Sequence, residues 1–80
     1  MGELEDASKF FENTIDIEPE HTEALQYSAL IFLLNKNLNS ALARIEQAVK
    51  ASDGNDIEIR HLYSKIRMAK RLDGIKSILM

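Results

Sequence analysis

The 80-residue chain is predicted to fold as an all-α protein. Apolar side chains recur at spacings of three and four along almost the whole sequence, which places them on one face of a helix. No segment alternates apolar and polar residues over the length that a half-buried strand requires. Residues known to interrupt helices divide the pattern into four segments, at Pro19, at 35–37 and at 52–55. Helices of ~14 residues joined by such short turns favour antiparallel neighbours.

The first half of the chain predicts two helices. Pro19 ends the first, because proline disfavours the helical conformation of the residue before it. Thr22 is the expected N-cap of the second. The stripe of the first helix is Leu4, Ala7, Phe11, Thr14 or Ile15, and Ile17, and that of the second is Leu25, Ala29, Phe32 and Leu33.

The second half predicts two more helices, separated by the sequence Ser52-Asp53-Gly54-Asn55. Asn55 and Glu58 have the spacing of a capping box, which would start the fourth helix. Asp73-Gly74 is the expected end of that helix, since glycine commonly follows a helix C-terminus. The stripes are Leu38, Ala41, Leu42, Ile45, Ala48 and Val49 in the third helix, and Ile59, Leu62, Tyr63, Ile66, Ala69 and Leu72 in the fourth.

The two halves also repeat each other at a period of 34 residues. A helical bundle has no reason to repeat in register, whereas a solenoid of stacked hairpins does. The matching positions are Leu4/Leu38/Leu72, Ala7/Ala41, Phe11/Ile45, Leu25/Ile59 and Phe32/Ile66.

These positions resemble the tetratricopeptide repeat. Residues 22–55 resemble one complete repeat, 2–21 the second helix of a partial repeat that begins with "GELEDA", and 56–72 the first helix of a third. The complete repeat is carried by Leu25, Ala29, Phe32, Ala41, Ile45 and Ala48. Departures from the family pattern are Ser28, Lys36, Asp53 and Tyr63. A related helical-hairpin repeat or an ordinary α-bundle remains the alternative.

The resemblance implies a short right-handed solenoid that forms a single domain over 1–80, with residues 73–80 as a tail. About two repeats are present, whereas roughly three are needed for stability. The sequence is therefore expected to be either part of a longer array or a short protein that uses a neighbour to cover its ends.

Charge is distributed unevenly along the chain, which has a net charge of −3. Residues 1–25 carry eight acidic side chains against Lys9 alone, and residues 56–80 carry six basic side chains against three acidic ones. One interpretation is solvated helix faces. The other is that the two ends contact neighbours of opposite charge.

Residues suited to catalysis or to ligand chemistry are few. His21 and His61 lie forty residues apart without a second ligand at metal spacing, and His21 is interpreted as a turn or cap residue. No nucleophile motif or phosphate-binding loop is present. We therefore expect neither an enzyme nor a cofactor or metal site. Six cations in an acidic chain make too weak an electrostatic footprint for a nucleic-acid partner.

The sequence is expected to be soluble and cytoplasmic, without a membrane partner. The longest apolar run, 29–34, is far shorter than the ~20 residues that cross a bilayer. The chain has no cysteine, which fits a reducing compartment.

The expected function is that of a non-enzymatic protein–protein interaction module or scaffold. In the family that the chain resembles, the first helix of each pair lines a concave groove. The resemblance therefore implies a groove formed by Tyr27, Leu30, Leu34, Arg60, His61, Ser64, Arg67 and Met68. Apolar residues beside basic ones suit a peptide or helix with apolar anchors and some acidic character. Leu30 and Leu34 could instead pack against neighbouring helices. A carboxylate clamp is not expected, because Gln26 and Leu30 stand at its lysine and asparagine positions.

Structural self-assembly is the alternative function. The apolar tail residues Ile75, Ile78, Leu79 and Met80 follow the expected end of the fourth helix. Either this tail folds back over that helix as a cap, or it mediates association into a homodimer or a larger array.

Overall fold

The computed structural model describes residues 2–79 and consists of four α-helices. They are α1 (Glu3–Ile17), α2 (Thr22–Leu34), α3 (Leu38–Ala51) and α4 (Ile57–Leu79). The all-α prediction is confirmed, since residues 2–79 contain no strand. Met80, which the sequence places in the apolar tail, lies outside the described residues.

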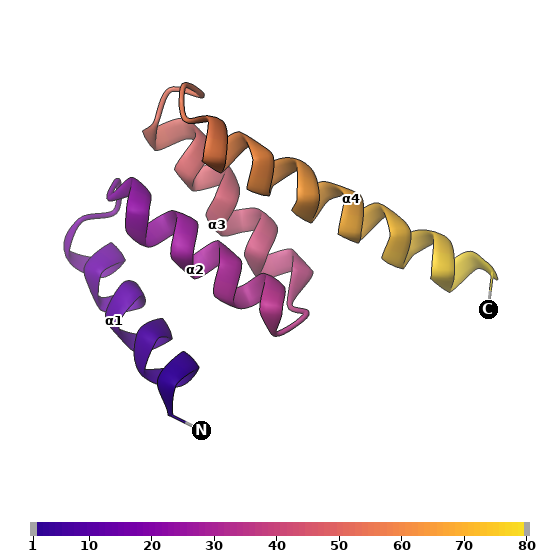
Figure 1. Ribbon diagram of the computed structural model, residues 1–80, viewed down its shortest axis with the longest axis horizontal. Helices are drawn as coiled ribbons and strands as arrows, with labels where there is room; N and C mark the ends of the chain where they lie inside the picture. Colours follow the sequence, from indigo (N-terminus) through magenta and orange to yellow (C-terminus); the bar gives the residue numbers. More distant parts are fainter. Residues whose placement is uncertain (1, 80) are drawn as a thin grey trace.

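The helices form consecutive antiparallel hairpins (Figure 1). The most extensive contact joins α2 to α3, while α1 packs on α2, and α4 packs on α3 with a small contact to α2. The molecule is flat, with extents of 42 × 34 × 17 Å. The second half of α4 projects beyond the other three helices (Figure 1).

The core is built from the predicted stripes of α2, α3 and the first half of α4. Leu25, Ile45, Ile59 and Ile66 are the largest fully buried side chains. Ala29, Ala41 and Ala48 are also completely buried. Small side chains at these positions let the helix backbones approach closely, because protein interiors are close-packed and have little room for added atoms.

Each turn beside α3 closes on a residue with positive φ. Lys36 has φ of 62°, and the amides of Lys36 and Asn37 donate to the carbonyls of Leu33 and Phe32. Asp53 has φ of 57°, and the turn after α3 repeats the same pair of hydrogen bonds one helix later. This pair of backbone hydrogen bonds is the Schellman motif, which ends many helices. The predicted boundaries at 35–37 and 52–55 are therefore confirmed.

The predicted caps of α2 and α4 are wrong by one residue each. His21, not Thr22, caps α2, because its Nδ1 accepts a hydrogen bond from the Ala24 amide at 3.1 Å. Asp56, not Asn55, binds the first amides of α4: its Oδ1 accepts from Glu58 at 3.0 Å and from Ile59 at 3.2 Å. In both places the capping side chain belongs to the residue directly before the first helical one.

The predicted end of the fourth helix is also wrong. α4 continues through Asp73 and Gly74 to Leu79. Gly54 is the glycine with positive φ among the described residues, and Gly74 is not. A glycine ends a helix when it adopts the left-handed conformation, and in a helical conformation it costs only about 1 kcal/mol relative to alanine. The tail therefore does not fold back as a cap: Leu72 is half exposed, and Ile78 and Leu79 are about four-fifths exposed.

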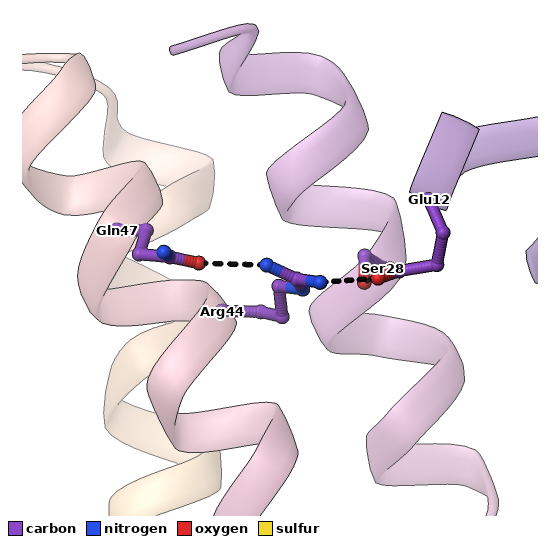
Figure 2. A network of polar contacts seen from close by, with 4 residues as sticks. All are labelled: Glu12, Ser28, Arg44 and Gln47. Atoms are coloured by element: carbon purple, nitrogen blue, oxygen red, sulfur yellow. Dashed lines mark hydrogen bonds and ion pairs between the residues drawn. The ribbon is translucent and has the colours of Figure 1, made fainter. Parts of the chain in front are cut away.

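A polar network joins three helices across the molecule (Figure 2). The Ser28 hydroxyl of α2 donates to the Glu12 carboxylate of α1, and the Arg44 guanidinium of α3 also donates to this carboxylate. Arg44 further donates to the Gln47 side chain at 3.0 Å. Ser28 is buried, so its hydroxyl needs such a partner. The network links α1 to α3, although these two helices do not pack directly.

Candidate binding surface

The three predicted site residues of α2 lie on its outer side. Tyr27, Leu30 and Leu34 are 44%, 36% and 60% exposed. The core face of α2 consists of other residues, among them Leu25 and Ala29. Leu30 and Leu34 therefore lie outside the core and present apolar surface to solvent.

Tyr27 also faces α1. Its ring stacks on that of Phe11, with centroids 5.3 Å apart and planes 19° from parallel. Phe10 meets Phe11 edge to face at 5.4 Å. A small hollow between α1 and α2 is lined by these three rings together with Thr14, His21, Glu23 and Ala24. Tyr27 thus belongs to an aromatic cluster that the sequence analysis did not identify.

The predicted site residues of α4 gather on one face of that helix. Arg60, His61 and Ser64 line a shallow hollow together with Ile57. Met68 lies one turn further on and is 64% exposed. The Arg67 guanidinium lies over the Tyr63 ring, 5.5 Å from its centroid, in a cation–π contact. Tyr63 itself packs against the core.

The structure does not join the two halves of the predicted groove into one pocket. In the part of the chain that is described, no hydrogen bond, ion pair or aromatic contact links the α2 set to the α4 set. The hollow beside Tyr27 and the one beside Arg60 are lined by different residues.

The sequence analysis missed an apolar stripe that runs along the whole outer side of α4. We call it the α4 seam and define it by Ile57, His61, Ser64, Met68, Leu72, Ile75 and Leu79. Its five apolar members are all exposed, from 44% for Ile75 to 79% for Leu79. The spacings of four, three and four from Met68 to Leu79 were available in the sequence. A predicted helix end at Gly74 separates Ile75 and Leu79 from Met68 and Leu72, so the sequence prediction does not join these residues into one stripe.

Basic side chains flank the seam. Lys65 and Lys76 lie along one side, and Arg60, Arg67 and Arg71 along the other. Glu58 is the acidic residue among these flanking positions, and all six residues are exposed. The face therefore combines an apolar line with positive edges.

A third hollow, of about 630 Å³, lies between the α2–α3 turn and the second half of α4. Lys36, Lys70 and Lys76 line it together with Asn37, Leu72 and Asp73. The hollow marks the point where α4 leaves the body of the molecule.

Within residues 2–79, no three His, Cys, Asp or Glu side chains are grouped as metal ligands. His21, the residue of the predicted turn, uses its Nδ1 to cap α2. Over the same residues, no helix combines the length and apolar character needed to span a bilayer. Comparisons of the chain with protein-family models, curated proteins and solved structures find no match.

Proposed function

We propose that this chain is a non-enzymatic protein-interaction module made of tetratricopeptide-like helical hairpins, which binds a peptide or helix of another protein on the outer faces of α2 and α4. The family resemblance is supported by the burial of Ala29, Ala41, Ile45 and Ala48. In the repeat pattern Ala29 and Ala41 are small residues that let helices pack closely, Ile45 fills the space between one helix pair and the next, and Ala48 is the second alanine of the pattern.

One observation carries the binding proposal: apolar side chains are exposed next to basic ones on two successive hairpins. Leu30 and Leu34 on α2 and Met68 on α4 are exposed, with Arg67 next to Met68 and Arg60 about two turns earlier on α4. Exposed apolar patches with polar rims are typical of interaction sites. Arginine is enriched at the centres of such interfaces.

The test is a pull-down from cell lysate that compares the wild type with a Leu30→Glu plus Leu34→Glu variant. The matched control is an Ile17→Glu plus Ala43→Glu variant, which places the same charge on exposed positions of α1 and α3. We expect specific partners to be lost with the α2 variant and retained with the control, while thermal melts show that both variants fold. An unchanged list of partners for the α2 variant would refute the proposal.

Self-assembly is a second candidate, favoured by the opposite charges of the outer helices. α1 carries five acidic residues against Lys9 and exposes Phe10 and Ile17, while α4 is basic and exposes its seam. Charge complementarity of this kind sets the orientation and rate of association more than its strength. Sedimentation velocity should then show a homodimer or a larger species that dissociates with added salt. A chain that stays monomeric at high micromolar concentration in low salt would exclude this candidate.

A further inference from the structure

The α4 seam is narrow and continuous. At 3.6 residues per turn, its seven positions fall within roughly 80° of the helix circumference. Most of them lie on the side of α4 opposite Ile59, Leu62 and Ile66, which face the core. Leu72, at one edge of the seam, also lines the hollow beside the α2–α3 turn. A stripe confined to such a/d positions is the geometry with which one helix meets another in a coiled coil.

The width of the seam argues against a lipid surface. A helix that lies in a membrane interface presents a broad apolar face, commonly with Trp or Phe. The seam contains neither residue, and His61 and Ser64 interrupt its apolar line. Cations lie at its edges, at Lys65 and Arg71, and one apolar side chain, Ile78, is exposed on the arginine edge.

The charge of the edges argues against a second copy of α4. In an antiparallel pair centred on Met68, Arg67 and Arg71 of one copy would lie beside the same residues of the other. A parallel pair would place the arginine edge beside Lys65 and Lys76. Like charges at such positions oppose pairing. The outer face of α1 is acidic, but it exposes three large apolar residues, Leu4, Phe10 and Ile17, opposite a seam with five apolar members.

We propose that the α4 seam binds an amphipathic acidic helix of a partner protein, laid along α4. Its apolar residues would repeat with the heptad spacing of the seam, and Glu or Asp would occupy the flanking positions. The 23 residues from Ile57 to Leu79 extend over about 33 Å of helix. This inference rests on the proposed function and deepens it, because it names the chemical class of the partner and extends the site to Leu79.

The test uses synthetic helical peptides as probes. One 21-residue peptide carries Leu and Ile at heptad positions a and d and Glu at e and g, and its control carries Lys at e and g. Fluorescence anisotropy with the full chain should show at least roughly tenfold tighter binding of the Glu peptide. The difference should shrink as salt rises from about 0.05 M to about 0.5 M. Equal binding of the two peptides would overturn the proposal.

Variants of the chain locate the site. Leu72→Glu plus Ile75→Glu should abolish binding of the Glu peptide. Lys70→Gln plus Ser77→Glu changes the net charge by the same amount on the other side of α4 and should leave binding within about twofold. Arg71→Glu plus Lys76→Glu brings the net charge of the flanking residues to zero and should abolish the preference for the Glu peptide. If the Leu72/Ile75 variant and the Lys70/Ser77 control weaken binding of the Glu peptide equally, the seam is not the binding site.

Other occupants give different results. Binding of the chain to vesicles of phosphatidylglycerol and phosphatidylcholine that is lost in the Leu72/Ile75 variant, without peptide binding, would identify a membrane surface and overturn the proposal. Self-association abolished by the same variant would identify a second copy and also overturn it. A lysate partner that is lost in the Leu30/Leu34 variant but kept in the Leu72/Ile75 variant would overturn this inference alone and leave the proposed function standing.

Discussion

Lys36 holds a backbone conformation that glycine adopts at lower cost. Its φ of 62° lies in the left-handed region, where an L side chain crowds the backbone. The position ends α2 and directs the chain into α3 through the hydrogen bonds from Lys36 and Asn37. The side chain is exposed, so replacing it removes no packing.

Lys36→Gly should therefore stabilise the fold by about 0.5–1 kcal/mol, despite the greater freedom of glycine in the unfolded chain. Lys50→Gly, an exposed position inside α3, is the control and should destabilise by about 1 kcal/mol. Urea unfolding followed by circular dichroism measures both. A destabilising Lys36→Gly would mean that the turn does not require a left-handed residue.

The Glu12 carboxylate accepts a hydrogen bond from the buried Ser28 hydroxyl, which would otherwise lack a partner. It also accepts a hydrogen bond from Arg44 of α3. The ion pair is partly shielded, with side-chain exposures of 24% and 32%. Removing the carboxylate leaves both donors without this partner, and a buried unsatisfied hydroxyl costs about 1–3 kcal/mol.

A double-mutant cycle of Glu12→Ala and Arg44→Ala should give a coupling free energy of about 0.5–1.5 kcal/mol. A matched cycle of Glu12→Ala with Lys50→Ala, which does not contact Glu12, should give a coupling near zero. Equal couplings in the two cycles would show that the network does not tie α1 to α3.

The sequence predicts which side chains fill the core better than it predicts which side chains cap the helices. Ala41, Ile45 and Ile66 are recognised by periodicity, because burial of a whole face repeats over many residues. A cap depends on the single residue at which a helix begins. An error of one residue in the predicted start of α2 therefore assigns the cap to Thr22 and not to His21. The Glu12–Arg44 pair could not be predicted, because its partners lie 32 residues apart.

α3 lies between two helices, since it packs against both α2 and α4. Ala41 has no exposed surface, whereas Ala43, two residues further on, faces solvent. The two positions allow the close approach of the helices to be tested within one element.

Ala41→Leu should destabilise the protein by about 1–3 kcal/mol, because added methylenes in a close-packed contact force the helices apart. Ala43→Leu is the control and should change stability by less than about 0.5 kcal/mol. Thermal unfolding measures both. A melting temperature of Ala41→Leu within about a degree of the wild type would contradict the packing of α3.

α4 is the element at which sequence and structure differ most. The breaker Asp73-Gly74 resembles the Ser52–Asn55 stretch, yet only the latter forms a turn. Asp53 and Gly54 take positive φ because the chain must reverse there to bring α4 onto α3. No such reversal follows Gly74, so the helix continues and the apolar stripe continues with it.

Gly74→Ala should therefore increase the helicity of residues 70–79, by up to about 1 kcal/mol in local helix stability. Carbon-13 Cα shifts and amide exchange rates in this segment are the measurements. Alanine also fits sterically, as no atom lies within 4 Å of the added Cβ. Reduced helicity in the variant would indicate that Gly74 ends the helix after all.

The flat arrangement of the four helices leaves large apolar side chains exposed to solvent on α1, α2 and α4. Phe10, Leu34 and Leu79 are each at least 60% exposed and lie on three different helices. Burial of such side chains against a partner is favourable by ~25 cal/mol for each Å² of apolar surface removed from water. Each hairpin therefore buries one face of its helices in the core and leaves the opposite face exposed to solvent, where a partner can bind.

The most direct test of the binding account is a methyl NMR titration of the full chain with the Glu-flanked helical peptide. The Ile, Leu and Met methyls of Ile57, Met68, Leu72, Ile75 and Leu79 should shift on binding. Those of the buried Leu25 and Ile45, and of the exposed Ile17 on α1, should remain within experimental error. Shifts confined to α1, or spread evenly over core and surface, would contradict the claim that this protein binds its partner along the outer face of α4.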